Sequence, residues 1–295
     1  MQIKDKRVIV TGAASGAGLA FSRELLRNGA LMIIMIDIRQ SHGEQAVESL
    51  NNEFGRKRAV FLYCDVTNNS EFDAAFKEAI NILGGLDILI NNAGVINETD
   101  FSEAIDVNVT AVIRGTLLGI QQMRKDSGGK GGVVVNISSI AGLQAVSQLP
   151  VYSATKHAVV SFSRSFADPY YYEKSGVTVI TLCPGLTETA LTIDSPNKLL
   201  SRVMKADFVK NLEQFSIQTP YVVAQGLMTI LRIGESGSIW VIESGRAPYE
   251  VYVPNPRTLR RHYKNNFSHV EPKVARGRPI REVCDNTRTG LMSCA

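Results

Sequence analysis

The chain has 295 residues, of which 44% are hydrophobic and 20% are charged. This composition allows a large buried core and excludes wholesale disorder. No apolar run approaches the roughly 20 residues that a membrane-spanning helix needs. The first seven residues are polar, so we expect no secretory signal and a cytoplasmic protein.

The net charge of +4 is unevenly distributed along the chain. Residues 246–295 contain ten Lys or Arg and four Asp or Glu, which gives +6, whereas the first 245 residues carry −2. Aromatic residues that could stack on bases are not interleaved with these basic residues in a recognisable pattern. We therefore expect an irregular extension over 246–295, with no nucleic-acid partner. The four cysteines show no CxxC spacing, and we predict no metal site.

Short apolar segments alternate with longer amphipathic ones along residues 1–245. We predict strands at 7–10, 31–36, 59–64, 86–91, 132–138, 177–183 and 238–242. Helices are predicted at 19–28, 43–54, 70–83, 101–125, 151–174 and 220–232. Units of about 30 residues indicate βαβ crossovers, hence an α/β domain with one parallel sheet of about seven strands and helices on both faces. Residues 187–218 interrupt the pattern after the sixth strand. Since ligands bind beside the carboxyl ends of such strands, we interpret this segment as a substrate lid.

A glycine-rich turn follows the first predicted strand. Residues Thr11 to Gly18 read TGAASGAG and lead directly into a helix. Such a turn lets the backbone approach a pyrophosphate, which the helix N-terminus then holds. Asp37 ends the second strand, where an acid accepts hydrogen bonds from the adenosine ribose and repels a 2′-phosphate. The pattern favours NAD over NADP, although Arg39 lies close enough to bind a phosphate.

Tyr152 and Lys156 lie four residues apart at the start of a predicted helix, and therefore share one face. A tyrosine hydroxyl has a pKa of about 10, and a neighbouring ammonium favours its phenolate. Tyr152 could then exchange a proton with a hydroxyl or carbonyl oxygen of a substrate. Ser139, at the end of the fifth strand, could hydrogen-bond the same oxygen.

Together these motifs resemble the short-chain dehydrogenase/reductase family, over residues 6–245. The glycine turn, Asp65-Val66, Asn91-Asn92-Ala93-Gly94, Asn108, Ser139, Tyr152 with Lys156, Pro184-Gly185 and Thr189 occur in the order of that family. The resemblance implies a Rossmann-type, doubly wound fold. It further implies that Asn108, Ser139, Tyr152 and Lys156 are catalytic, with Asn108 holding a water in a proton relay. Dimers or tetramers built through the fourth and fifth helices are also implied.

The resemblance assigns binding roles to further residues. Those expected to bind NAD are Gly12, Ser15, Gly16, Ala17, Gly18, Asp37, Ile38, Asp65, Val66, Asn92, Ala93, Gly94, Tyr152, Lys156, Pro184, Gly185, Thr187 and Thr189. Those expected to contact the substrate are Ser139, Leu143, Gln148, Leu149, Tyr152, Leu186 and Leu191. A pocket lined by so many apolar residues suits a steroid, prostanoid, retinoid or terpenoid alcohol.

Within the family, PVYSATKHAVVSFSRS resembles NAD-dependent 15-hydroxyprostaglandin dehydrogenases, and GSIWVIESG resembles insect alcohol dehydrogenases. The leading hypothesis is an NAD-dependent dehydrogenase that acts on a hydrophobic secondary alcohol, with Tyr152 as general acid/base. One alternative is an NADP(H)-dependent carbonyl reductase, which Arg39 supports. Another is a catalytically weak NAD-binding protein with a structural or storage role, because a fold does not fix a function.

Overall fold

The computed structural model describes residues 1–212 and 216–254. Residues Met1–Tyr252 form one compact unit. Most of the predicted basic extension, together with Cys284 and Cys294, lies outside the described residues.

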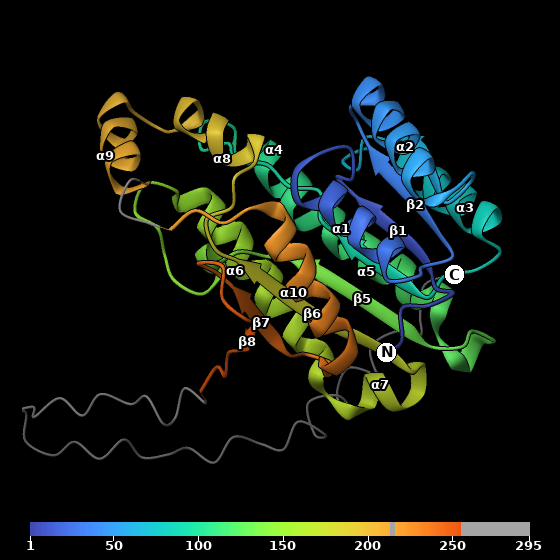
Figure 1. The fold of residues 1–295 in the computed structure, drawn as a ribbon. Helices are drawn as coiled ribbons and strands as arrows, with labels where there is room; N and C mark the ends of the chain where they lie inside the picture. Colours follow the sequence, from blue (N-terminus) through green and yellow to red (C-terminus); the bar gives the residue numbers. More distant parts are fainter. Residues whose placement is uncertain (213–215, 255–295) are drawn as a thin grey trace, which may run out of the picture. The chain divides into compact units, whose positions relative to one another are not determined.

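A single sheet organises this unit (Figure 1). Its strands are β1 (Arg7–Thr11), β2 (Met32–Asp37), β3 (Ala59–Tyr63), β4 (Ile88–Asn91), β5 (Gly132–Ile137), β6 (Val177–Pro184), β7 (Ile239–Ile242) and β8 (Tyr249–Glu250). Their order is β3-β2-β1-β4-β5-β6-β7-β8, and β1 to β7 are parallel. The order reverses between β1 and β4, the position at which open α/β sheets bind ligands. The predicted doubly wound α/β fold is confirmed.

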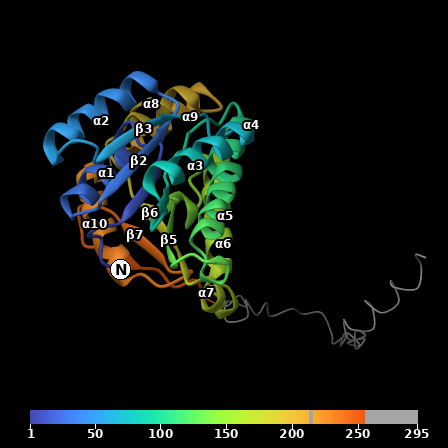
Figure 2. The same cartoon turned by 90° about the vertical axis from the view of Figure 1, so that its right-hand side faces the viewer.

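Helices cover both faces of the sheet, as Figure 2 shows. The long helices are α1 (Gly16–Arg27), α2 (Gln40–Phe54), α3 (Asn69–Leu83), α5 (Ala111–Met123), α6 (Pro150–Arg164) and α10 (Pro220–Ile233). Helices α1, α2 and α10 lie on one face, and α3, α5 and α6 lie on the other. In β2, Ile33 and Met35 pack into one core cluster, while Ile34 and Ile36 pack into the other. Burial on both faces explains why this strand is continuously apolar.

Two long helices predicted from the sequence are interrupted in the structure. The 101–125 helix consists of α4 (Phe101–Ile105), a π-helical turn at Asp106–Thr110, and α5. The predicted 151–174 helix ends at Arg164, and a separate helix, α7 (Pro169–Ser175), follows. Proline disfavours helical geometry in the residue before it, and Asp168 is accordingly extended, with φ −64° and ψ 128°. The prediction of one continuous helix over 151–174 was wrong.

The region after β6 is partly helical. It contains α8 (Ala190–Asp194), a 3₁₀ turn at Ser195–Lys198 and α9 (Arg202–Leu212). Thr187 and Gln218 form an isolated parallel bridge that joins the two ends of the segment. The sheet also continues past residue 245, because β8 pairs antiparallel with β7. The prediction of irregular structure from residue 246 onward was therefore wrong for Tyr249–Glu250.

Candidate functional site

The glycine-rich turn between β1 and α1 is tightly packed. Gly12 adopts φ +62°, and a Cβ atom there would lie 2.8 Å from the Cα of Ala93. A Cβ atom on Gly18 would collide with the carbonyl oxygen of Gly12. Side chains at these two positions would fill the space beside the N-terminus of α1, so the turn forms a cradle that backbone amides can line.

The turn after β4 is bonded to this cradle. The Thr11 hydroxyl accepts hydrogen bonds from the backbone N–H groups of Asn92 (3.0 Å) and Ala93 (3.1 Å). The Nδ2 atom of Asn92 donates to the carbonyl oxygens of Thr11 and Gly12, both at 3.0 Å. These bonds fix the two loops that flank the switch point of the sheet relative to each other.

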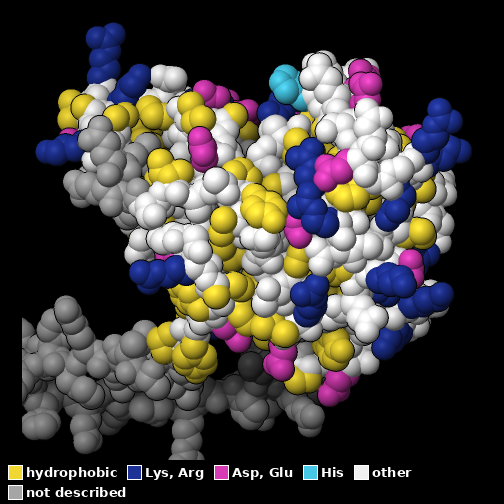
Figure 3. All heavy atoms as spheres, in the orientation of Figure 1, with side chains coloured by type: hydrophobic (Ala, Val, Ile, Leu, Met, Phe, Trp, Pro, Cys, Tyr) yellow, Lys and Arg dark blue, Asp and Glu magenta, His cyan; other side chains and the backbone are white. Residues whose placement is uncertain are grey.

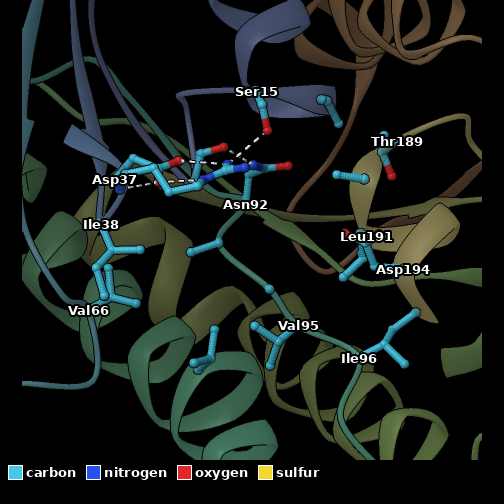
Figure 4. A pocket seen from close by; sticks show the side chains of 18 of the residues that line it. Ser15, Asp37, Ile38, Val66, Asn92, Val95, Ile96, Thr189, Leu191 and Asp194 are labelled. Carbon is cyan, nitrogen blue, oxygen red and sulfur yellow. Dashed lines mark hydrogen bonds and ion pairs between the residues drawn. The ribbon is translucent and has the colours of Figure 1, made fainter. Parts of the chain in front are cut away.

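Asp37 is a buried carboxylate at the end of β2 (Figure 4). Its Oδ2 atom accepts from the backbone N–H of Ala14 at 2.9 Å, and its Oδ1 atom accepts from the N–H of Arg39 at 3.0 Å. The Arg39 guanidinium pairs with Asp37 through Nε at 3.2 Å, and its Nη2 donates to the Ser15 hydroxyl at 2.8 Å. Arg39 thus lies across the edge of the cleft between the glycine turn and Asp37, where it offsets the charge of the carboxylate.

Apolar side chains border the cleft near Asp37. Ile38 and Val66 both point into this part of the pocket, Ile38 from the end of β2 and Val66 from the loop after β3 (Figure 4). The neighbouring Asp65 is held in place, because its Oδ1 accepts from the Thr67 N–H at 2.9 Å and from the Thr67 hydroxyl at 2.8 Å. An apolar wall beside an orienting carboxylate suits a flat heteroaromatic ring.

A cavity of about 520 Å³ runs along this edge of the sheet. Of the residues predicted to bind NAD, those that line it are Gly12, Ser15, Gly16, Ala17, Asp37, Ile38, Asp65, Val66, Asn92, Ala93, Gly94 and Thr189. Gly18, Tyr152, Lys156, Pro184, Gly185 and Thr187 lie outside its lining. Arg39, Glu103, Asp194 and Lys198 also line the cavity and bring charged groups to it, although the binding set predicted from the sequence omits them.

The four residues predicted to be catalytic come from three elements. Tyr152 and Lys156 lie in the first half of α6, Ser139 follows β5, and Asn108 lies in the π-helical turn between α4 and α5. The Nζ atom of Lys156 is 5.5 Å from the centroid of the Tyr152 ring and donates to the carbonyl oxygen of Ile137 at 3.0 Å. Tyr152, Lys156 and Asn108 are all buried.

Burial shifts the two titratable groups toward their neutral forms. Desolvation raises the pKa of the Tyr152 hydroxyl to about 12, although a hydrogen bond with Ser139 opposes the shift. Desolvation also lowers the pKa of the Lys156 ammonium to about 8. The Lys156 side chain is therefore close to its titration midpoint at mildly alkaline pH, whereas Tyr152 is protonated.

Asn108 links the loop after β4 to α6. Its Oδ1 accepts from the N–H of Val95 at 2.9 Å, and its Nδ2 donates to the Val95 carbonyl oxygen at 2.8 Å and to the Thr155 hydroxyl at 3.1 Å. A Cβ atom on Gly94 would lie 3.3 Å from Oδ1 of Asn108 and 3.5 Å from Nζ of Lys156. Asn108, Gly94 and Lys156 therefore converge on one point, and π-helical turns often occur at such functional positions.

An apolar cluster covers the Tyr152 end of the site. It contains Ile96, Ala141, Leu149 and Tyr152 from the body of the domain, and Leu199 and Phe208 from the 187–218 segment. The same segment exposes further apolar side chains on its outer surface, at Ile193, Leu200 and Val203, and hydrophobic groups are visible around α8 and α9 in Figure 3. The apolar residues that the structure describes in this segment are therefore divided between the cover over Tyr152 and the solvent.

The residues predicted to contact substrate are dispersed around this cluster. Leu149 and Tyr152 belong to it, and Leu191 lines the large cavity. Ser139, Leu143, Gln148 and Leu186 are half-buried, and the apolar cluster contains none of them among the described residues.

Two buried side chains that the sequence analysis did not select hold the site together. The Nε2 atom of Gln218 donates to the Ile242 carbonyl oxygen at 2.7 Å, and its backbone bonds to Leu186 and Glu188. The Glu98 carboxylate accepts from the N–H groups of Val151 (2.8 Å) and Tyr152 (2.9 Å). Neither residue belongs to a local motif, since each acts on a segment more than twenty residues away.

The described residues contain no cluster of three or more His, Cys, Asp or Glu suited to a metal ion. In the same part of the chain, none of the helices has the length and apolar character needed to cross a membrane.

Comparison with known proteins shows the family of the chain. Residues 6–200 match the short chain dehydrogenase family. Human 15-hydroxyprostaglandin dehydrogenase (NAD(+)) is 37% identical over 234 residues, which cover 78% of this chain and 88% of the human protein. Alcohol dehydrogenase 2 of Ceratitis capitata is 30% identical over 246 residues, covering 83% and 94% of the two chains. A crystal structure of a short chain dehydrogenase/reductase from Burkholderia phymatum in complex with NAD has a TM-score of 0.68 and 21% identity, covering 79% of this chain and 87% of that one. The chain belongs to the short-chain dehydrogenase family.

Proposed function

We propose that this protein is an NAD-dependent dehydrogenase that interconverts a hydrophobic secondary alcohol and its ketone, with Tyr152 as the general acid/base. The observation that carries the proposal is the buried pair of Tyr152 and Lys156, in which the ammonium lies 5.5 Å from the centre of the tyrosine ring. This pair lies beneath an apolar cover, and Gly94, which lines the large cavity, lies beside Lys156.

The cofactor assignment rests on the cradle and on Asp37. The glycine turn leaves room for a pyrophosphate at the N-terminus of α1, and the Asp37 carboxylate offers acceptors to a ribose. The human relative is named for NAD(+). Arg39 could bind a 2′-phosphate, but in this structure its guanidinium is engaged by Asp37 and Ser15. When bound, NAD supplies the acceptor for the substrate hydride.

Proton transfer is assigned to Tyr152. Ser139 holds the substrate oxygen within reach of the Tyr152 side-chain oxygen, which takes the alcohol proton as a phenolate during oxidation and returns it as a phenol during reduction. Since burial raises the pKa of Tyr152 to about 12, a nearby positive charge is needed to favour the phenolate. Protonated Lys156 provides that charge, and Asn108 orders the loop beside it.

The apolar cover supports a hydrophobic substrate of the steroid, prostanoid, retinoid or terpenoid class. We propose that residues 187–218 act as a lid, hinged where Thr187 pairs with Gln218. In the closed arrangement, Leu199 and Phe208 occupy the space over Tyr152. A substrate with a large apolar surface can replace these contacts when the lid opens, at little cost in exposed hydrophobic area.

The test is NADH formation from NAD with a panel of hydrophobic secondary alcohols, run beside Tyr152→Phe. We expect wild-type turnover that falls at least about 1000-fold in the variant, while NADH binding, measured by fluorescence, is retained. Full turnover by Tyr152→Phe would contradict the assigned mechanism.

The same assays distinguish the alternative functions. Turnover with NADPH alone would favour a carbonyl reductase. NAD binding without turnover of any compound would favour a structural or storage role.

We also propose a homo-oligomer. The exposed fractions of Phe101 (64%), Ile105 (44%) and Leu117 (53%) are large for apolar side chains, and all three lie on α4 and α5. Burying them against a second copy would remove this surface from water. Light scattering on the wild type and on Leu117→Glu tests this. A monomeric wild type would contradict the proposal.

A further inference from the structure

Glu98 is a buried carboxylate in the loop between β4 and α4. Only 2% of its surface is exposed. Its Oε2 atom accepts from the backbone N–H of Val151 at 2.8 Å, and its Oε1 accepts from the N–H of Tyr152 at 2.9 Å. Both donors belong to the first turn of α6, the helix that carries Tyr152 and Lys156.

These two bonds satisfy the free backbone N–H groups at the N-terminus of α6. A helix leaves its first N–H groups without partners inside the helix. In α6, the N–H of Leu149 donates to the Val146 carbonyl at 2.9 Å, and Pro150 has no N–H group. The only remaining free donors of the first turn are those of Val151 and Tyr152, and Glu98 accepts from both. The N-cap residue Leu149 makes no side-chain capping bond among the described residues.

The charge of Glu98 is balanced by the helix rather than by a cation. Among the described residues, Glu98 forms no ion pair with a Lys, Arg or His side chain. Burial of an unpaired charge is costly, but charge-assisted bonds to two helix amides and the positive end of the helix dipole offset that cost. The arrangement therefore depends on the position of one side chain and on its two acceptor oxygens.

The loop that carries Glu98 is fixed from the opposite side. The N–H of Glu98 donates to the carbonyl oxygen of Lys198 at 2.9 Å, in the 187–218 segment. Ile96, two residues earlier, packs in the same apolar cluster as Tyr152 and Phe208. Glu98 thus contacts the first turn of α6 through its side chain and the proposed lid through its backbone.

We propose that Glu98 is a positioning residue, which holds the first turn of α6 so that the Tyr152 hydroxyl meets the substrate oxygen. This inference rests on the proposed role of Tyr152. It assigns Glu98 no contact with substrate or cofactor. Because the Tyr152 N–H is itself one of the two donors, loss of this bond releases the backbone of the residue that carries the reacting hydroxyl.

The test compares Glu98→Gln with wild type at saturating NAD and alcohol. The glutamine can accept from only one of the two N–H groups, and its own N–H₂ faces the other. We expect kcat to fall about 10- to 100-fold, as for a modest misplacement of a reacting group, with the dissociation constant for NADH within about twofold of wild type. Glu98→Asp, which keeps the charge on a shorter side chain, should lie between the two and serves as the second variant if Glu98→Gln does not fold.

Two controls separate positioning from stability. Asp168→Asn makes the same chemical change at the N-cap of α7, where Asp168 accepts from the Tyr170 N–H at 2.9 Å. Val159→Ala removes buried volume from α6 without affecting its N-terminus. Both should retain kcat, and Val159→Ala should lower the melting temperature. A Glu98→Gln enzyme that melts earlier but keeps kcat within twofold of wild type would overturn the inference. Full activity in Tyr152→Phe would overturn the proposed function as well, so the two failures are distinguishable.

Discussion

The ammonium group of Lys156 lies 5.5 Å from the centre of the Tyr152 ring and 3.0 Å from the carbonyl oxygen of Ile137, with both side chains buried. Burial disfavours the charged form of each of these two groups. It raises the pKa of Tyr152 to about 12 and lowers the pKa of Lys156 to about 8. The site therefore holds its cation at the expense of stability, as functional sites often do.

The stability of the protein should reveal this cost through its pH dependence. Below pH 8 the folded protein carries a buried ammonium, whereas between pH 8 and 10.5 the folded state releases the proton that the unfolded state retains. The free energy of unfolding of the wild type, compared with that of a variant without the amine, therefore rises between pH 8 and 10.5. The total rise is about 3 kcal/mol. Urea unfolding of wild type and Lys156→Met at pH 7, 8, 9 and 10 measures the difference. The exposed Lys77→Met should show no such trend, and a pH-independent difference for Lys156→Met would contradict the buried ammonium.

Cofactor preference should depend on the Asp37–Arg39 pair. Asp37→Ala removes the proposed acceptor for a ribose and frees the Arg39 guanidinium. A lost hydrogen bond to a charged group corresponds to about 10- to 100-fold in affinity, so the KM for NAD should rise by that factor. Use of NADP should improve at the same time. Steady-state kinetics with both cofactors measure the change, and Asp37→Ala combined with Arg39→Ala should lose the gain with NADP. A gain that persists in the double variant would show that Arg39 is not the phosphate ligand.

Gln218 should stabilise the base of the proposed lid. Gln218→Leu removes one of the two donors to the buried carbonyl of Ile242, which keeps its bond from the Gly185 N–H at 2.8 Å. Loss of one such bond costs about 0.5–1.5 kcal/mol. We expect a lower free energy of unfolding and a higher KM for the alcohol, because the Thr187–Gln218 bridge loosens. Gln225→Leu, which removes an exposed bond to Tyr221, is the matched control and should change little. Unchanged stability in Gln218→Leu would contradict the prediction and show that the bond from the Gly185 N–H alone satisfies the Ile242 carbonyl.

The parts of the fold and site that were predictable from sequence are local. The glycine turn and Asp37 lie at the ends of adjacent strands, so strand order and periodicity bring them to one edge of the sheet. Glu98 was not predictable, because its role depends on contact with residues 53 and 54 positions away. The break before α7 had a local signal in Asp168-Pro169, but apolar periodicity continues across it and favoured a longer helix.

The C-terminal boundary of the catalytic domain can be tested with two truncations. Ending the chain after Tyr252 keeps β8 and the bond from the Val251 N–H to the Ile239 carbonyl, whereas ending it after Gly245 removes both. The shorter chain leaves β7 as the edge of the sheet, with unpaired backbone groups. We expect residues 1–252 to keep the kcat and melting temperature of the full chain, and residues 1–245 to lose about 2 kcal/mol of stability. Calorimetry, light scattering and the NADH assay on the three chains measure this. The 1–252 chain retains β8 and its bonds to β7. Loss of turnover in that chain would therefore place residues 253–295 in catalysis or assembly.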